Sequence, residues 1–314
     1  MNNPLIITVG FCPAWDMICR ADDIDWGRHV RVSQSVYPAG KALNVSRALA
    51  WLGKKNVAAG LWGQRDWPDA QMSLSGCQNR IDFHMTLAAG QTRRNVTVID
   101  TRRHLEMHLR APCSLATRTS LSQLAGDLKS IIRSACWVVF SGAMPEGDLL
   151  DDCLTIIQDL CRSGVKVAVD SSGLALRRAV ELGGLALFKP NLEELGQLLG
   201  HSIPNDPLAI EEAARVFCNR SQIILVSRGP EGAMIITKDR RIECRAVILQ
   251  NQAEKTVGCG DYLLAGFLAS EDTTDLCGRL GTAVKAATAH AIGLSQSMDW
   301  PTAAAHIRIE QRQT

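Results

Sequence analysis

The chain has 314 residues, of which 46% are hydrophobic and 21% charged, and its formal net charge is +2. These are ordinary values for a globular protein, and the length fits one large domain or a large domain with a small appendage. A charge so close to neutral gives no reason to expect nucleic acid or an anionic membrane as a partner.

The cysteines and the N-terminus indicate a cellular location. Eleven cysteines are present without a Cys-x-x-Cys pair or a zinc-like His/Cys spacing. Several, such as Cys136, Cys153 and Cys161, lie in apolar stretches, where free cysteine behaves as a small hydrophobic residue. The apolar run from Leu5 to Cys12 is too short for a membrane span and unlike a signal peptide. We therefore expect a soluble cytoplasmic protein with no membrane partner.

The first predicted element is a buried strand at Leu5–Val9. The following turn places Asp16 just beyond the strand's carboxyl end, where ligands bind in open α/β sheets. Asp16 is therefore a candidate ligand-binding residue, with an ordinary solvated loop residue as the alternative. Residues 17–37 then alternate valines with polar residues, as half-buried strands do.

A helix with one buried face is predicted next, because apolar residues recur at steps of three and four between 42 and 52. Gly40 precedes this helix, and Lys41 and Asn44 lie in its first turn. A lysine there opposes the helix dipole, so we expect a nearby acidic group or anion to offset it. The alternative is a lysine that faces solvent. A Walker-type nucleotide loop is excluded, because Ser35 and Ala42 stand where that motif needs Gly and Ser or Thr.

Short strands without intervening helices predict a second, smaller sheet. They are candidates at 81–87, 95–99 and 105–109, and they follow a second buried strand at 57–61 and a short helix at 67–77. We assign 11–37 and 91–112 to a small β-sheet lid, and 1–10, 38–90 and 113–314 to an α/β domain. Arg93 lies where the second lid segment begins, and arginine suits phosphate. A solvated polar strand edge is the alternative for such residues.

From about residue 120, helices and strands alternate regularly. Helices are predicted at 121–134, 148–163, 174–183, 191–199 and 207–220, strands at 137–141, 165–170, 186–189 and 223–227, a hairpin at 233–245, and helices from there to the C-terminus. Continuous apolar strands are typical of a parallel sheet covered on both faces. Several of them end in polar residues, among them Ser141, Asp170, Lys189 and Ser227. Polar ends gathered at one rim of a parallel sheet predict a ligand crevice.

The stretch Thr256–Asp261 combines two glycines with a carboxylate at the start of an apolar helix. Backbone N–H groups at a helix start have no partner within the helix and attract anions. A carboxylate beside an anion site is electrostatically unfavourable, which indicates that Asp261 is there for chemistry. The alternative is that Asp261 simply caps a core helix.

Eight stretches, in sequence order, resemble motifs of the ribokinase-like (PfkB) sugar kinases, and more narrowly of the hexose-phosphate kinase branch. They are Cys12–Asp16 (like N-P-A-L-D), Pro38–Val45 (like G-G-K-x-x-N), Thr92–Asn95 (like T-R-x-N), Ser141–Pro145 (like S-G-S-L-P), Asp170–Gly173 (like D-T-S-G), Lys189–Leu195 (like K-P-N-x-x-E-L), Val226–Gly229 (like V-S-L-G) and Thr256–Asp261 (like T-V-G-A-G-D).

This resemblance implies a three-layer α/β/α domain with a mainly parallel sheet and a small β-sheet lid, which such kinases often use for homodimer contacts. It also implies phosphoryl transfer from ATP, with Mg²⁺ and a monovalent cation, to a hydroxyl of a hexose phosphate. The candidate acceptors are fructose 1-phosphate, fructose 6-phosphate and tagatose 6-phosphate.

The resemblance also implies roles for individual residues. Asp261 would be the base, and Gly258, Cys259 and Gly260 would supply N–H donors to the migrating phosphoryl group. The sugar would be held by Asp16, Gly40, Lys41 and Asn44, and its phosphate by Arg93. ATP would lie along Lys189, Asn191, Ser227 and Gly229, and Mg²⁺ would be held through water by Asn191 and Glu194.

Some residues depart from the motifs. Ala39 stands where glycine is usual, Tyr262 follows the base where a small residue is common and is expected to narrow the site, and Cys259 at a helix start is expected to have a lowered thiol pKa. The segment 105–112 lacks the usual N-E-P-G pattern, which leaves a second phosphate contact open between His108 and Arg110. Two other functions remain: a kinase of an unphosphorylated sugar or nucleoside, and a non-catalytic sugar-phosphate-binding relative.

Overall fold

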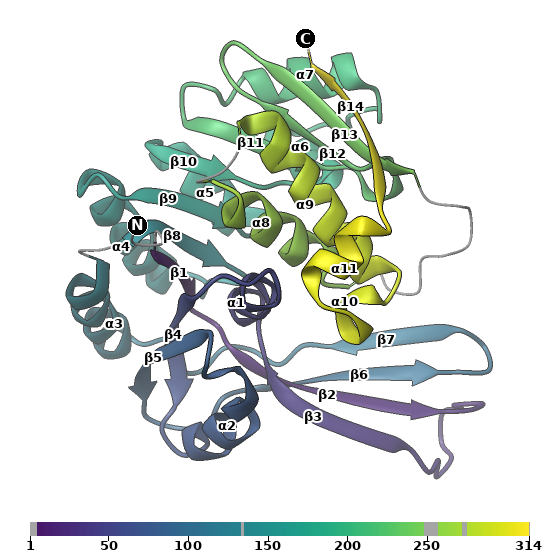
Figure 1. Ribbon diagram of the computed structural model, residues 1–314. Helices are drawn as coiled ribbons and strands as arrows, with labels where there is room; N and C mark the ends of the chain where they lie inside the picture. The colour runs from purple at the N-terminus through teal and green to yellow at the C-terminus, as the bar shows by residue number, and fades with distance from the viewer. Residues whose placement is uncertain (1–4, 133–134, 248–256, 272–274, 314) are drawn as a thin grey trace.

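The computed structural model describes residues 5–132, 135–247, 257–271 and 275–313. Within this part of the chain the strands form a ten-stranded sheet and a separate four-stranded sheet (Figure 1). No helix among these residues combines the length and the apolar character that crossing a membrane requires.

The large sheet is parallel except at one edge. In spatial order its strands are β14 (Arg308–Gln313), β13 (Arg241–Val247), β12 (Ala233–Ile236), β11 (Ser221–Ser227), β10 (Leu185–Phe188), β9 (Lys166–Asp170), β8 (Ala135–Ser141), β1 (Leu5–Gly10), β4 (Asn56–Gly63) and β5 (Ile81–Ala88). The pairs from β11 to β5 are parallel, and those from β11 to β14 antiparallel. Chain order runs outward in both directions from the β8–β1 pair, so the carboxyl ends of these two strands form a topological switch point.

Helices cover both faces of this sheet (Figure 1). One face carries α3 (Arg118–Ile131), α4 (Asp148–Arg162), α5 (Gly173–Leu182), α6 (Leu192–Leu199) and α7 (Pro207–Arg215), and the other carries α1 (Lys41–Trp51), α8 (Cys259–Ala269), α9 (Leu276–Ala291), α10 (Leu294–Ser297) and α11 (Trp300–Ala305). Strand β8 supplies Val138 and Phe140 to one apolar cluster and Trp137 and Val139 to the other. Burial on both faces is the reason that the central strands read as continuous apolar runs, and it confirms the predicted three-layer α/β/α fold.

The small sheet lies to one side of the three layers, at the bottom of Figure 1. Its order is β3 (Ser33–Ala39), β2 (Ala14–Ala21), β6 (Arg94–Asp100) and β7 (Leu105–Leu109), with β2 and β6 parallel and the other pairs antiparallel. The short helix α2 (Trp67–Ser73) packs beside it through a cluster that includes Trp15, Trp62 and Trp67. The division of the chain into a domain and a lid at the predicted boundaries stays a prediction.

The end of the chain differs from the prediction. Helices were expected up to the C-terminus, but residues 308–313 form β14, which pairs with β13 at the edge of the sheet. This strand is mostly exposed and polar, with Ile309 as its one apolar residue. A sequence pattern could not reveal it, because backbone pairing with β13 rather than apolar periodicity determines its conformation. Helix α7 also ends at Arg215, five residues before the predicted end at 220.

Candidate active site

A cavity of about 790 Å³ opens at the carboxyl ends of the parallel strands. Strand ends and the positions just after them contribute Gly10, Ser141, Asp170 and Lys189 to its wall. The residues that the sequence singled out as site candidates all line it: Asp16, Gly40, Lys41, Asn44, Arg93, Lys189, Asn191, Glu194, Ser227, Gly229, Gly258, Cys259, Gly260 and Asp261. The predicted crevice at the rim of the sheet is therefore present, and its volume is in the usual range for small-ligand sites. Thr256, which opens the glycine motif, lies outside the described residues.

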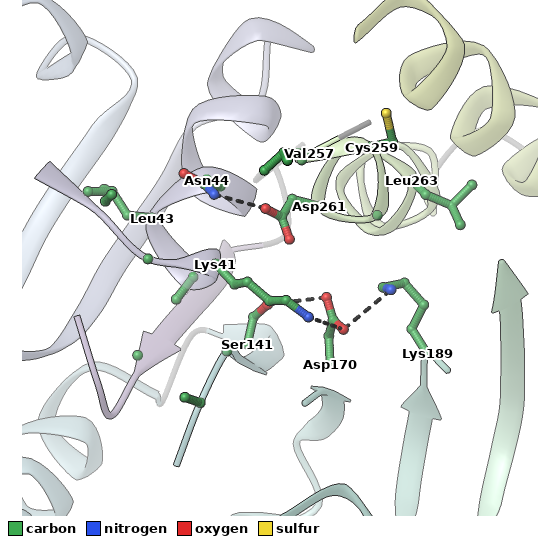
Figure 2. Close-up of a pocket in the computed structure, with 18 of the residues that line it drawn as sticks. Lys41, Leu43, Asn44, Ser141, Asp170, Lys189, Val257, Cys259, Asp261 and Leu263 are labelled. Carbon is green, nitrogen blue, oxygen red and sulfur yellow. Dashed lines mark hydrogen bonds and ion pairs between the residues drawn. The ribbon is translucent and has the colours of Figure 1, made fainter. Parts of the chain in front are cut away.

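Asp261 lies in the first turn of α8 and points into this cavity toward α1 (Figure 2). Gly258 begins the helix with φ of 90°, and a Cβ there would lie 2.8 Å from Nε2 of His290, so the turn requires glycine. The Asp261 carboxylate is 4% exposed and accepts a hydrogen bond of 2.9 Å from Nδ2 of Asn44. The N-cap of α8 is Gly258, so the interpretation of Asp261 as the cap of this helix is wrong.

A second carboxylate, Asp170 at the end of β9, links two lysines (Figure 2). Its Oδ1 lies 3.4 Å from Nζ of Lys41 and 3.3 Å from Nζ of Lys189. The acidic group expected to offset Lys41 is therefore Asp170, which the sequence marked as a polar strand end and as the start of a motif, but without a role. The sequence did contain a signal for this contact. Asp170 and Lys189 lie at the ends of consecutive parallel strands, and the ends of such strands meet at one rim of the sheet.

The two carboxylates have opposite pKa shifts. Burial, followed by the charge of Asp170, raises the pKa of Asp261 to about 6, against the opposing effects of Lys41, Asn44 and Lys189. Burial alone would raise the pKa of Asp170, but the ammonium groups of Lys189 and Lys41 lower it below its usual value. Asp170 in turn raises the pKa of Lys41. The cavity thus holds one firmly ionised carboxylate and one whose proton affinity suits acid–base work near neutral pH.

Positive charge surrounds the start of α8. A Cβ on Gly260 would lie 3.2 Å from Nζ of Lys189, so this ammonium group lies against the helix backbone. The first N–H groups of a helix carry partial positive charge. Lys189 and the residues from Gly258 to Gly260 therefore form a surface that attracts an anion.

On the side of the small sheet, Asp16 accepts a hydrogen bond of 3.1 Å from Nδ2 of Asn95. Arg93 donates to the carbonyl oxygens of Cys12, Pro13 and Ala111 at 2.8–3.2 Å, so each of its three nitrogens already has a backbone acceptor. The guanidinium therefore joins the turn before β2 to the segment after β7, in addition to lining the cavity.

The positions of His108 and Arg110 differ, and this bears on which of them could be the second phosphate contact. Arg110 lines the cavity, whereas Nδ1 of His108 lies 3.1 Å from Oγ1 of Thr97 and its Nε2 lies 3.5 Å from Oε1 of Glu106. Arg110 is therefore the residue of this pair that can reach a bound ligand.

On the opposite side of the cavity, Asn191 and Glu194 cap α6 reciprocally. Glu194 N donates to Oδ1 of Asn191 at 2.8 Å, and Asn191 N donates to Oε2 of Glu194 at 2.9 Å. Ser227 forms a β-bridge with Asn191. Among the described residues there is no group of three or more His, Cys, Asp and Glu that could hold a metal. One carboxylate beside one amide fits Mg²⁺, which keeps several waters and takes its other ligands from phosphates.

Two expectations about departures from the motifs are wrong. Burial and then the charge of Asp261 raise the pKa of the Cys259 thiol, although the position at a helix start predicted a lowered value. Tyr262 does not narrow the cavity: its ring stacks on His290 with 4.1 Å between centroids and contacts Trp51 edge-on, outside the residues that line the cavity.

Comparisons with known proteins agree with this geometry. The chain matches the family described as pfkB family carbohydrate kinase over residues 6–301. It is 29% identical to a 1-phosphofructokinase of Xanthomonas campestris, covering 88% of each chain. It is 27% identical to the ATP-dependent 6-phosphofructokinase isozyme 2 of Escherichia coli, covering 82% of this chain and 83% of that one.

Solved structures show the same fold. Phosphofructokinase-2 from Escherichia coli in complex with fructose-6-phosphate superposes with a TM-score of 0.84 at 23% identity, covering 98% of this chain and 99% of that one. The complex of that enzyme with potassium gives 0.85 at 24% identity, covering 98% of each chain. The fold is that of a carbohydrate kinase. The chain belongs to the pfkB family, and its curated relatives are sugar-phosphate kinases.

Proposed function

We propose that this protein is an ATP-dependent kinase that phosphorylates a hydroxyl of a hexose phosphate, with Asp261 as the base. The observation that carries the proposal is the convergence in one cavity of a buried carboxylate with raised pKa, two ammonium groups and a helix start. The names of the curated relatives favour fructose 1-phosphate or fructose 6-phosphate as the acceptor. Tagatose 6-phosphate is the third candidate.

Asp261 accepts the proton of the sugar hydroxyl as the hydroxyl oxygen attacks the terminal phosphorus of ATP. Asn44 orients the carboxylate through their hydrogen bond of 2.9 Å. The N–H groups of Gly258, Cys259 and Gly260, together with Lys189, stabilise charge on the transferring phosphoryl group. Phosphoryl transfer needs little covalent chemistry from a protein, so this alignment and charge stabilisation supply most of the rate enhancement.

The small-sheet side of the cavity binds the sugar phosphate. Asp16, Gly40, Lys41 and Asn44 hold the sugar. Arg110 contacts its phosphate, and Arg93 adds positive charge from its position behind the turn at Cys12. This arrangement favours a phosphorylated acceptor over a free sugar or nucleoside.

The opposite side binds the nucleotide, along Lys189, Asn191, Ser227 and Gly229. Asn191 and Glu194 would hold Mg²⁺ through its waters, and the ion would neutralise phosphate charge. The monovalent cation that the resemblance implies stays a prediction without assigned residues.

We also propose a homodimer formed through the small sheet. Strand register places Met17, Val36, Val96 and Leu109 in one row across it, on the face opposite to Asp16 and Asn95, which line the cavity. Val36 is 44% exposed and Leu109 51%, so an apolar face lies open on the side away from the substrate. A cytoplasmic location is the remaining proposal, supported by the free, buried thiols of Cys12, Cys153 and Cys244.

The test is ADP release measured with fructose 1-phosphate, fructose 6-phosphate, tagatose 6-phosphate, ribose and adenosine. We expect turnover with one or more of the sugar phosphates. The Asp261→Asn variant should lose about 10²–10⁴-fold in kcat, the usual contribution of a positioned base, while ATP binding stays intact. Asp69→Asn, an exposed aspartate in the first turn of α2, is the matched control.

Unchanged turnover in Asp261→Asn would remove this residue from the base role. If the protein binds ATP and sugar phosphate but releases ADP with none of the acceptors, the non-catalytic alternative is established.

A further inference from the structure

Two thiols lie where the chain crosses between the two sheets. Cys12 lies in the connection from β1 to β2, and Cys113 in the connection from β7 to α3 (Figure 1). Cys12 lines the substrate cavity and stands where the resembling motif has asparagine. The function proposed above uses neither thiol.

Several contacts hold these two connections against each other. Sγ of Cys113 lies 3.8 Å from the carbonyl oxygen of Phe11, the residue before Cys12. Arg93 donates to the carbonyl oxygens of both Cys12 (3.0 Å) and Ala111 (2.8 Å), so one guanidinium ties the two segments together. Each of the two thiols is the largest single influence on the pKa of the other, which places them close together.

We propose that Cys12 and Cys113 form a redox modification site, at which a peroxide converts the two thiols reversibly into a disulfide that links the two crossings between the sheets. Such sites combine a reactive, accessible thiol with a resolving thiol beside it. Cys113 is partly exposed and Cys12 is buried next to it, which assigns the first role to Cys113 and the second to Cys12.

The electrostatics agree with these roles. The Cys12 side chain, more than any other group, lowers the pKa of Cys113 to about 6, with help from backbone N–H groups and the charge of Arg93. The Cys113 side chain, followed by burial, raises the pKa of Cys12. The lowered pKa increases the fraction of Cys113 that is deprotonated at neutral pH, and the thiolate is the nucleophile in cysteine oxidation.

The chemistry balances with hydrogen peroxide as the only co-reactant. The Cys113 thiolate attacks one peroxide oxygen, the O–O bond breaks, and the released hydroxide takes a proton, giving a sulfenic acid and water. Sγ of Cys12 then attacks the sulfenic sulfur, the S–O bond breaks, and the leaving hydroxide takes the Cys12 proton to form a second water. Overall two thiols lose two hydrogens and two electrons, and the peroxide is reduced to two waters.

A third thiol nearby is a poorer partner. Cys153 is fully buried in α4, and its charge affects the pKa of Cys12 less than Cys113 does. Burial also raises the pKa of Cys153, which leaves its thiol protonated and unreactive.

The test treats the folded, reduced protein with hydrogen peroxide, blocks remaining thiols with iodoacetamide, and maps peptides by mass spectrometry without reduction. We expect a cross-linked Cys12–Cys113 peptide in the wild type that dithiothreitol removes. The link should form equally in Cys161→Ser, a matched control on α4, and should be lost in Cys12→Ser and Cys113→Ser. In Cys12→Ser, Cys113 should instead be trapped by dimedone as a sulfenic acid.

Three results would each overturn the proposal. They are oxidation of wild-type Cys113 directly to sulfinic acid, a disulfide link to Cys153, and oxidation of Cys161 in preference to the pair. If a serine variant fails to fold, the alkylation rate of each wild-type cysteine decides: Cys113 must react fastest at neutral pH. None of these measurements needs a substrate, so they stand even if the proposed kinase activity fails. If that activity holds, we further expect oxidation to inhibit turnover and dithiothreitol to restore it, because Cys12 lies in the cavity wall.

Discussion

At the scale of single residues, the cavity depends on two buried carboxylates that do different work. Asp170 has two lysines within 3.4 Å and stays ionised, so its role is to hold those lysines in place. Asp261 has an amide partner and a raised pKa, so it can exchange a proton. The same residue type is suited to anchoring in one position and to the proposed base role in the other, because burial and neighbouring charges differ.

This difference predicts a pH dependence. A base works only when deprotonated, so kcat/KM should fall as the pH drops through about 6, the pKa of Asp261. Asp170→Asn removes a negative charge that raises this pKa, while Lys41 and Lys189 continue to lower it. The acid limb of the profile should therefore move to lower pH.

The measurement is kcat/KM across pH for the wild type, Asp170→Asn and the Asp69→Asn control, whose limb should coincide with that of the wild type. If Asp170→Asn only released the two lysines, the plateau of kcat/KM would fall while the acid limb of the pH profile stayed in place. A limb that stays in place or moves to higher pH in Asp170→Asn would contradict the assignment.

At the scale of elements, the position of Asp261 depends on how closely α8 packs against α9. Gly266 in α8 lies at this contact, where an added Cβ would be 2.7 Å from Cα of Ala283 and 2.9 Å from the carbonyl oxygen of Thr282. These are backbone atoms, which cannot move aside as a flexible side chain can. The helix that carries Asp261 is therefore held by a contact that only glycine permits.

We expect Gly266→Ala to lower the free energy of unfolding by about 1–3 kcal/mol, the usual cost of overpacking a core. Gly126→Ala is the matched control, because Gly126 is exposed in α3 and an added Cβ would meet nothing within 4 Å. The control should be neutral or stabilising by up to about 1 kcal/mol, since alanine favours a helix interior over glycine. Urea denaturation of both variants measures this, and equal effects at the two sites would show that the α8–α9 contact is not tight.

At the scale of the whole molecule, the two faces of the small sheet differ in chemical character. One face presents Asp16 and Asn95 to the cavity, and the other presents an apolar row to solvent in the monomer. The register of the strands separates them, because successive side chains point to opposite faces. The sheet can therefore cover substrate on one side and a second copy of the chain on the other.

We expect the wild-type protein to run as a dimer in size-exclusion chromatography with light scattering. A double substitution, Val36→Lys with Met107→Lys, places charges on the apolar face and should give a monomer. Leu208→Lys, at an apolar residue of α7 that is even more exposed, should remain dimeric. A monomeric wild type, or a double variant that stays dimeric, would disprove association through this face.

Local patterns in the sequence were sufficient for much of this protein. The apolar runs predicted the strands and their burial on two faces, and the glycines with Asp261 marked the start of α8. Polar residues at strand ends predicted the rim at which the cavity lies, because parallel strands of one sheet end together. These features could be predicted because each depends on residues that are close together in the chain.

Only the tertiary structure decided what the side chains meet. It placed Asp170 against Lys41, 129 positions away, turned Tyr262 onto His290, paired β14 with β13, and raised the pKa of Cys259 where a helix start predicted a lowered one. Burial and charge at a given side chain come from segments far apart in sequence, and a pattern of nearby residues carries no record of them. The sequence by itself therefore determined the fold and the rim of the cavity, whereas the packing of distant segments decided which groups in that cavity can do chemistry.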